Sequence, residues 1–509
     1  MKLTTPFSAV FVFAIGVAVP AAAQYVAPAR APAQVLSGGI HSSDEDQFHG
    51  SIAIGEAAST PLELSLQDAI DRAIKNNLGL VVRGSLTSAA RADRLRALSA
   101  LLPNVSGGIT QNETQIDLAV YGLHVTGFPL VVGPFHYTDA RAYASSSLFD
   151  WTSIKNLRSS AQSARAAELS LEDGRDLVVE AAASGYFAVL ADGGRVDATR
   201  TQAQTAEALY NAARDRHRAG LSAAIDELRA QVEMKTQQQR LAAAENAFAR
   251  DKLALGRVIG LPSGQGFRLT DEAPYSPLEG LDAGELLQKA FETRADFRAG
   301  QAQVRAAELA REAADAQRYP TATVDANYGA IGQSLNNSHG TFTVAASVSF
   351  NIFDAGRIRS TQQAASAEIQ RRRGELADLR GKIDFEVRTA LLDLSTAADQ
   401  AALARSNLDL ANQTLDQARD RFSAGVADNI EVVQAQEALA GASEDTINSL
   451  YAHNLAKVAL ARAVGGAEAS LKQYLSGIGP QPDAGKLHPA ASVSGDCEDA
   501  AASCARGGK

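Results

Sequence analysis

The chain has 509 residues, of which 58 are acidic, 48 are basic and only two are cysteine. This acidic balance excludes a typical nucleic-acid-binding protein, because binding to phosphates relies on clustered Lys and Arg. The two cysteines, Cys497 and Cys504, lie in a tail rich in Ala, Gly and Ser, where a disulfide is compatible with an oxidising compartment. A metal site there is disfavoured, because no His or third thiol is spaced to complete four ligands. We expect no cofactor.

Residues 1–23 have the pattern of a secretory signal peptide. Lys2 precedes an apolar run at 7–19, and three alanines end at Ala23. The apolar run is too short to span a membrane as a helix, and no later run approaches the roughly 20 apolar residues that a span needs. We therefore expect an exported protein without a helical span, and residues 24–60 are expected to be a flexible segment.

Two halves of the chain share one order of segments. Residues 64–103 match residues 281–320 at a constant offset of 217 positions. Farther along, "RHRAGLSAAIDELRAQ" begins at Arg216 and "RFSAGVADNIEVVQAQ" begins at Arg421, 205 positions later. The offset falls because the first half has about 13 extra residues before its Phe149. This pattern indicates an internal duplication.

We divide the chain accordingly into two repeats, at 61–260 and 281–466. The connector at 261–280 contains three prolines. Residues 467–509, rich in Ala, Gly, Pro and Ser, are expected to be a disordered tail.

Each repeat contains one long helix. No Pro occurs between Pro134 and Pro262 or between Pro320 and Pro480, and Pro is strongly disfavoured inside helices. We predict long helices at about 151–217 and 356–423, each on the order of 100 Å long. Apolar residues in the second helix alternate spacings of three and four, the heptad pattern of a coiled coil. This seam comprises Ile383, Val387, Ala390, Leu394, Ala397, Ala401, Ala404, Leu408, Ala411, Leu415, Ala418 and Phe422.

The matching seam of the first helix is interrupted. Asp192, Thr199 and His217 occupy positions where the second helix has apolar residues. We interpret these polar positions as a more solvated groove.

Alternation with a period of two precedes each long helix and predicts β-strands. We expect strands at about 103–112 and 138–149 in the first repeat, and at 321–331 and 341–352 in the second. Their length and single apolar face are typical of transmembrane strands in outer-membrane barrels. The residues expected to face lipid are Val324, Ala326, Tyr328, Phe342, Val344, Val348, Phe350 and Ile352.

Four strands cannot close a barrel, because the smallest outer-membrane barrels have about eight. Open strand edges in lipid would leave backbone groups unpaired. An oligomer that pools strands is therefore required, with two chains for eight strands or three chains for twelve. The apolar loop at 118–135 is compatible with a plug, a contact with lipopolysaccharide or a packed loop.

The signal peptide, the doubled order of segments and the motifs "SLQDAIDRAIKNN", "FNIFDAGRIR" and "RFSAGVADNIEVVQAQ" together resemble the TolC-like outer-membrane efflux protein family. The resemblance covers residues 64–465. It implies a mainly α fold with a β-barrel part, in which three chains supply four strands each to one 12-stranded barrel. The long helices would continue this barrel as an α-helical tunnel across the periplasm.

The resemblance places the doubled motif at the periplasmic tips, where each long helix turns back. Gly suits such a reversal because it accepts positive φ without steric cost. Family members present these turns to a periplasmic adaptor protein. The contacts expected here are Ala219, Gly220, Leu221, Ala424, Gly425 and Val426.

The resemblance also implies a pore constriction just beyond the second turn. Alignment on Gly425 places the two carboxylates of the family pattern at Glu431 and Gln434, so one of them is an amide here. The matching residues of the first half are Asp226 and Arg229, which could bond along one helix. The alternative for Glu431 is a solvated helix residue.

These features imply a passive outer-membrane exit duct of a tripartite efflux or type I secretion system. Its tip would open when an adaptor and an inner-membrane pump of RND or ABC type engage it. An enzyme is disfavoured, since the sequence has no HExxH or GxSxG motif and its eight His are scattered. The alternative is a periplasmic coiled-coil scaffold without a pore, which the lipid-like strand faces disfavour. The cargo stays open, with small molecules or drugs expected from the family.

Overall fold

The structure is a computed structural model. It describes residues 48, 50–122, 126–127, 129–271, 275–276, 278, 280–334, 336–426 and 429–474, all within one compact unit. The expected signal peptide and both cysteines lie outside the described residues.

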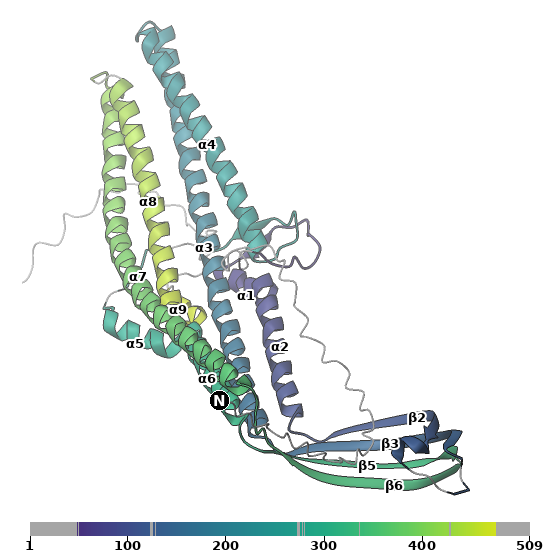
Figure 1. The fold of residues 1–509 in the computed structure, drawn as a ribbon. Helices are drawn as coiled ribbons and strands as arrows, with labels where there is room; N and C mark the ends of the chain where they lie inside the picture. The colour runs from purple at the N-terminus through teal and green to yellow at the C-terminus, as the bar shows by residue number, and fades with distance from the viewer. Residues whose placement is uncertain are drawn as a thin grey trace, which may run out of the picture. The chain divides into compact units, whose positions relative to one another are not determined.

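The two repeats follow the same order of elements (Figure 1). The first comprises β1 (Leu62–Leu64), α1 (Leu66–Asn76), α2 (Leu78–Ser99), β2 (Asn104–Asp117), the 3₁₀ helix η2 (Leu118–Tyr121), β3 (Val131–Phe149), α3 (Trp151–Arg218) and α4 (Ala224–Val258). The second comprises α5 (Ala283–Thr293), α6 (Ala295–Ala316), β5 (Thr321–Ser334), β6 (Asn337–Ser349), α7 (Arg357–Ser423) and α8 (Asn429–Val464). Strand β4 (Phe267–Leu269) lies in the connector, and α9 (Ala467–Tyr474) follows the second repeat.

The short helices of the two repeats correspond residue for residue. Both bounds of α1 and both bounds of α2 recur 217 positions later in α5 and α6. Each pair is broken by one residue in an extended conformation, Asn77 in the first repeat and Arg294 in the second. The Asn77 side chain accepts hydrogen bonds from the N–H groups of Gly79 and Leu80, so it caps α2. Arg294 cannot cap a helix in this way and makes ion pairs instead, as described below.

The heptad seam predicted in the second half is confirmed as a packing surface. Most of its members are buried in α7, from Ile383 at one end to Ala418 near the other. Near the tip, Leu415 and Ala418 pack against Val432 and Ala435 of α8. The small alanine side chains of the seam let the two antiparallel helices approach closely.

The seam of α3 differs from expectation at Asp192, which is buried rather than solvated. Its carboxylate forms an ion pair with Arg195, and that guanidinium also donates a hydrogen bond to Asn448 of α8. Burial raises the pKa of Asp192 above its ordinary value, against the charge of Arg195. The polar interruption is therefore a buried polar contact.

Among the described helices, α3 contains one stretch that is long and apolar enough to cross a membrane by composition alone. In this stretch 44% of the residues are buried inside the protein. The apolar character of α3 is accounted for by its packing, since α1, α2, α4, α6 and α8 all lie against it (Figure 1).

Four strands form one antiparallel sheet in the order β2-β3-β5-β6. The central pair, β3 and β5, joins the two repeats. Strands β2 and β6 are the edges of this sheet. A second, two-stranded sheet pairs β1 with β4 in parallel.

The strand bounds differ from those predicted. Strands β2 and β3 reach Asp117 and Val131, beyond the expected ends at 112 and 138. Strand β6 ends at Ser349, so Phe350 and Ile352 lie outside it. Pairing stops there because Ser349 is opposite Thr321, the first residue of β5 after Pro320. The inclusion of Phe350 and Ile352 in the lipid-facing strand was wrong.

Both ends of the repeat region are more ordered than expected. In the segment predicted to be flexible, Phe48 is buried in the core and Ser51 pairs with Asn77. In the predicted tail, α9 buries Leu471 and Tyr474 in the same core. The Asp176 carboxylate accepts hydrogen bonds from the N–H groups of Gly466 and Ala467 and so caps α9. Burial raises the pKa of Asp176 above its ordinary value, against the charge of Arg462.

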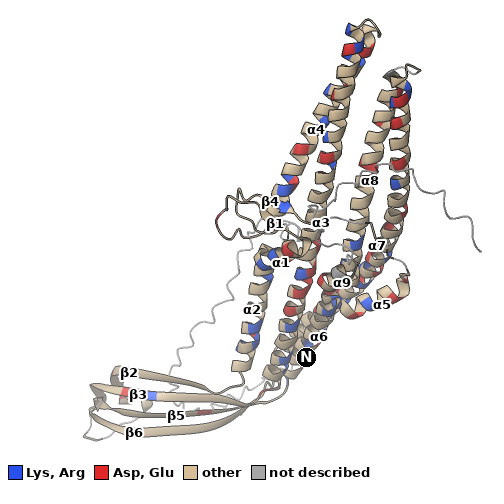
Figure 2. Ribbon diagram, turned by 180° about the vertical axis from the view of Figure 1, so that it is seen from behind, with Lys and Arg blue, Asp and Glu red and all other residues tan. Residues whose placement is uncertain are grey.

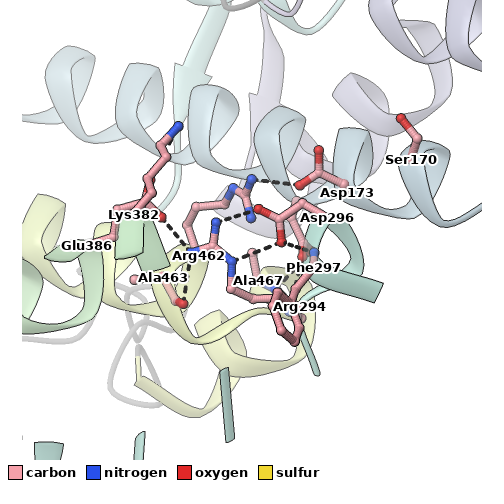
Figure 3. A network of polar contacts seen from close by, with 12 residues as sticks. Ser170, Asp173, Arg294, Asp296, Phe297, Lys382, Glu386, Arg462, Ala463 and Ala467 are labelled. Atoms are coloured by element: carbon pink, nitrogen blue, oxygen red, sulfur yellow. Dashed lines mark hydrogen bonds and ion pairs between the residues drawn. The ribbon is translucent and has the colours of Figure 1, made fainter. Parts of the chain in front are cut away.

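A buried polar junction holds the repeats together (Figure 3). Arg294, only 2% exposed, pairs with Asp296 at 2.6 Å and with Glu386 of α7 at 2.5 Å, and donates to the carbonyl of Ala463 in α8. Burial by itself raises the pKa of Asp296, but the hydrogen bonds and charge of Arg294 outweigh it and hold this pKa below its ordinary value.

The junction extends across to the first repeat through α8. Arg462 lies 2.7 Å from the carboxylate of Asp173 in α3, and Arg83 of α2 approaches the same carboxylate at 3.0 Å. A pair of charges that is removed from water needs such complete pairing. The junction therefore fixes how α2, α3, α7 and α8 meet.

The connector is anchored to the same helix. Lys457 of α8 is buried, and its Nζ donates a hydrogen bond of 2.6 Å to the carbonyl of Ser276. Burial lowers the pKa of Lys457. The neighbouring Tyr275 hydroxyl donates to the carbonyl of Ala398 in α7. Both bonds tie the chain that links the repeats to the second helical pair.

Substitution of two glycines separates backbone strain from crowding. Both Gly425 and Gly465 have positive φ, 72° and 89°, so alanine at either site costs roughly 1–2 kcal/mol. A Cβ at Gly425 meets no atom within 4 Å, whereas one at Gly465 lies 2.9 Å from Cγ of Arg294. We expect Gly465→Ala to lower the thermal unfolding temperature, followed by circular dichroism in detergent, more than Gly425→Ala. Equal shifts would show that the junction tolerates displacement of Arg294.

Candidate channel surfaces

The four-stranded sheet has one continuous apolar face. In antiparallel pairing, residues directly opposite one another lie on the same face. Val324, Ala326 and Tyr328 of β5 lie opposite Ala346, Val344 and Phe342 of β6. The same face continues into β2 and β3 through the pairs Val105 with Ala144 and Ile109 with Ala140. Its large side chains are exposed, with Phe342 at 76% and Ile109 at 75%.

The opposite face of the sheet is polar. Arg141 of β3 lies on it and bonds to Asp139 at 3.0 Å, to Asn327 at 2.6 Å and to Thr341 at 3.1 Å, so it links three strands. Ser145 donates to Asp325 across the same pair of strands. Charged residues are spread along the helices, whereas the strands carry few (Figure 2). One apolar face and one polar face are the pattern of outer-membrane barrel strands.

The two helical tips are built by the same turn. At the first, the N–H of Gly220 bonds to the carbonyl of His217, and the N–H of Leu221 bonds to that of Arg216. At the second, Gly425 and Val426 make the same bonds to Phe422 and Arg421. This is the Schellman motif, which requires a left-handed residue, and both glycines have positive φ.

Each Schellman turn exposes the apolar side chain that follows its glycine. The residue after the glycine of a Schellman motif frequently makes an apolar contact with the end of its own helix. Leu221 and Val426 hold this position, yet they are 78% and 72% exposed. Ala424 and Gly425 beside Val426 are exposed as well, as are Ala219 and Gly220 beside Leu221. Both turns therefore present a small apolar surface that the described residues leave uncovered.

Three pairs of acidic and basic side chains at the tips each lie within one repeat. Glu431, near the start of α8, lies 3.4 Å from Arg421 at the end of α7. Asp226 lies 3.8 Å from Arg229 one turn along α4, as the sequence spacing allows. His217 Nδ1 lies 2.6 Å from the carboxylate of Glu227. Gln434 is exposed on α8, one turn beyond Glu431.

Arg216 connects the two tips and was not singled out by sequence reasoning. Its guanidinium donates hydrogen bonds of 3.4 Å to the carbonyl of Phe422 and lies 4.5 Å from the centre of the Phe422 ring. The signal was present in the doubled motif, because both copies begin with Arg. Arg216 turns toward the other repeat, whereas Arg421 pairs with Glu431 in its own.

Within the described residues, no group of three or more His, Cys, Asp or Glu is placed to hold a metal ion. The arrangement offers two sheet faces of different polarity and two exposed helical turns.

A family model described as outer membrane efflux protein matches the chain twice, over residues 69–261 and 286–466. The chain belongs to this family. The two matched segments coincide with most of each repeat, so one copy of the family model describes one repeat of this chain.

Named relatives of this efflux protein cover most of its length. It is 24% identical to the pyoverdine export outer membrane protein OpmQ of Pseudomonas aeruginosa, over 81% of this chain and 87% of OpmQ. It is 22% identical to the toluene efflux pump outer membrane protein TtgC of Pseudomonas putida, over 79% of this chain and 83% of TtgC. The crystal structure of the CmeC outer membrane channel of Campylobacter jejuni aligns with a TM-score of 0.70 and 16% identity, over 84% of this chain and 95% of CmeC.

Family membership settles the broad class of the protein. Outer membrane efflux proteins are channel proteins of the outer membrane, and their fold combines a β-barrel with a helical tunnel. The predicted fold class and location are thereby confirmed.

The two sheet faces make a matched test. Phe342 and Thr343 are neighbours in β6 and lie on opposite faces, the apolar one and the polar one. An Arg on the lipid face of an outer-membrane strand costs about 2–4 kcal/mol near the bilayer midplane. We expect Phe342→Arg to reduce the amount of assembled protein in outer-membrane fractions, measured as the heat-sensitive oligomer on gels. Thr343→Arg should assemble normally, and loss of assembly in both variants would contradict this assignment of the faces.

Proposed function

We propose that this chain is the outer-membrane exit duct of a tripartite efflux or type I secretion system, working as a homotrimer. The observation that carries the proposal is the four-stranded sheet, which has one apolar face and two edge strands, β2 and β6. Three copies would supply twelve strands, and β6 of each copy would pair with β2 of the next. Lipid would contact the apolar face, and the polar face with Arg141 would line the barrel.

The duct acts passively in this proposal. The long pairs α3–α4 and α7–α8 of three copies would form the wall of a periplasmic tunnel. An inner-membrane pump of RND or ABC type would supply the energy, and the duct itself would carry no enzymatic activity and no cofactor. A periplasmic coiled-coil scaffold without a pore is the alternative. The exposed apolar face of the sheet disfavours it, because a soluble scaffold would place that face in water.

A periplasmic adaptor would dock on the helical tips. The six expected contact residues all lie in the two Schellman turns, and two of them, Leu221 and Val426, are exposed apolar side chains. The adaptor would cover these side chains. The same turn geometry in both repeats would let one kind of adaptor segment bind to each.

The entrance would be narrowed by residues just beyond the turns. In this proposal Glu431 and Gln434 of α8 and Asp226 and Arg229 of α4 face the constriction. Arg421 lies next to Glu431, and Arg229 lies next to Asp226. The ring formed by these constriction residues would therefore be less acidic than the family pattern. Opening would separate the tips when adaptor and pump engage, moving Glu431 outward.

The cargo is proposed to be small organic compounds. The names of two relatives refer to different cargoes, pyoverdine for OpmQ and toluene for TtgC. Such a difference fits a duct whose substrate is chosen by its pump. Met234 is the only Met left after the expected signal peptide, which disfavours copper transfer along methionines.

Two substitutions in opposite directions test the constriction. In planar bilayers, we expect Glu431→Ala to weaken inhibition of conductance by multivalent cations, because the carboxylate ring is lost. Gln434→Glu should strengthen it, because one carboxylate per copy is added. A tenfold shift of the inhibitory concentration corresponds to about 1.4 kcal/mol.

Unchanged inhibition in both variants would contradict the constriction while leaving the channel intact. Absence of any conductance in the purified wild-type protein would contradict the duct.

Docking at the tips is tested by Leu221→Asp and Val426→Asp. Burial of a Leu side chain contributes about 1.5–3 kcal/mol, so its loss should weaken adaptor binding at least roughly tenfold. The readout is co-purification of the adaptor encoded with the pump, together with the minimum inhibitory concentration of an exported drug. Leu221→Met keeps an apolar side chain and serves as the control. Normal co-purification of the Asp variants would place the docking surface elsewhere.

A further inference from the structure

The first hairpin of the sheet is longer than the second. Strand β5 pairs with β3 only as far as Gly332, which lies opposite Thr138. Strands β2 and β3 stay paired beyond that point, from Asn112 with Tyr137 to Asp117 with Val131. Residues 112–117 and 131–137 therefore form a two-stranded ribbon beyond the last pair of β3 with β5. At about 3.3 Å per residue, the six residues of β2 give it a length of roughly 20 Å.

The ribbon lies at the end of the sheet away from the helices (Figure 1). The opposite end of the sheet is joined to the helices, because β2 begins at Asn104 shortly after α2, and β3 ends at Phe149 just before α3. In an outer-membrane duct this is the extracellular end. The ribbon also accounts for the extra residues that the first repeat has before Phe149.

The two faces of the hairpin exchange character where the ribbon begins. The pairing register stays constant from Asn104 to Thr114, so each face can be followed without a break. The face that carries Val105 and Ile109 in the sheet reaches Gln111 and Thr138 at the end of the sheet and carries Glu113 and His136 in the ribbon. The lipid side of the sheet thus continues as a polar outer face.

The other face changes in the opposite sense. In the sheet it carries Asp139 and Arg141, but in the ribbon it carries the pairs Asn112 with Tyr137 and Thr114 with Phe135. Beyond a bulge, Ile116 follows on the same side of β2, opposite Val132. The lumen side of the sheet thus continues as an inner face with two aromatic, two aliphatic and two uncharged polar side chains.

A ribbon that stood alone in water would not be expected to carry an uncovered apolar face. A single two-stranded hairpin is at best marginally stable alone, and no third strand of the described chain pairs with this one above Thr138. It needs a surface against which to bury its apolar face. That face points toward the barrel axis, where the same faces of the other two copies lie.

We propose that the inner faces of three ribbons pack against one another above the barrel and form an extracellular seal over the exit. The partner of each ribbon is thus a second copy of this chain. The inference rests on the trimer of the proposed function. The uncharged inner face allows three copies to meet without like-charge repulsion, and the barrel contact of β2 with the next copy continues directly into the ribbon. A contact with lipopolysaccharide phosphates would instead need a basic outer face, and that face carries Glu113.

Two adjacent residues test the seal. In a Cys497→Ser/Cys504→Ser background, Phe135→Cys places a thiol on the inner face and His136→Cys places one on the outer face. Both variants are assembled as full-length protein in outer membranes and oxidised with copper phenanthroline. We expect a covalent dimer on denaturing gels from Phe135→Cys only, since three thiols around one axis can form one disulfide. The His136→Cys protein should stay monomeric after denaturation.

A second measurement is independent of disulfide geometry. Phe135→Ser/Tyr137→Ser should increase single-channel conductance in planar bilayers, whereas His136→Ser should leave it unchanged. Equal cross-linking at both positions, or an intact trimer with neither cross-linking at Phe135 nor increased conductance, would overturn the seal and leave the duct standing. A preparation without a heat-sensitive trimer would overturn the proposed function and the seal with it.

Discussion

Unpaired backbone groups are the constraint on which the whole architecture depends. A strand edge cannot face hydrocarbon, because each unsatisfied N–H or C=O there costs several kcal/mol. This chain builds four strands and leaves β2 and β6 as edges. The apolar face of this sheet can therefore lie in a membrane only when other copies pair with the edge strands. Closure of a barrel by several copies follows from that one requirement.

Polar contacts divide the helices into a firmly held part and a loosely held part. At the junction, Arg294 and its partners are largely removed from water, and breaking such a pair is strongly destabilising, by about 3–5 kcal/mol. At the tips, the pair of Glu431 with Arg421 is about half exposed on both sides. Exposed pairs contribute only about 0–1 kcal/mol. Movement at the tips therefore costs little while the junction stays fixed.

The sequence was sufficient for the repeats and the long helices, because both leave regular patterns. The offset of 217 predicted the correspondence of α1 and α2 with α5 and α6, and the heptads predicted the buried seam of α7. Contacts between distant segments leave no such pattern. Asp192 looked like a solvated interruption because its partners, Arg195 and Asn448, are identified only by the fold. The capping of α9 by Asp176 was hidden for the same reason.

The two turns and the apolar strand face could be located from the sequence, whereas the contacts around them could not. The doubled Ala-Gly motif marked both turns, and alternation marked the apolar strand face. The pairing of Glu431 with Arg421 could not be foreseen, because it depends on how the chain crosses the turn. The end of β6 was also predicted incorrectly. Alternation of apolar and polar residues continues to Ile352, whereas pairing of β6 with β5 ends at Ser349.

The length difference between the two hairpins shows where this architecture can change. Residues added inside a helix or within a paired strand would shift every later side chain to a different face. Residues added in equal numbers to both strands of a hairpin, next to its loop, leave the other side chains on their faces. The pairing register of the rest of the sheet does not change. The first repeat has gained length at this place, between Gln111 and Tyr137. The outer mouth is thus the part of the chain that can diversify by insertion without rebuilding the barrel or the tunnel.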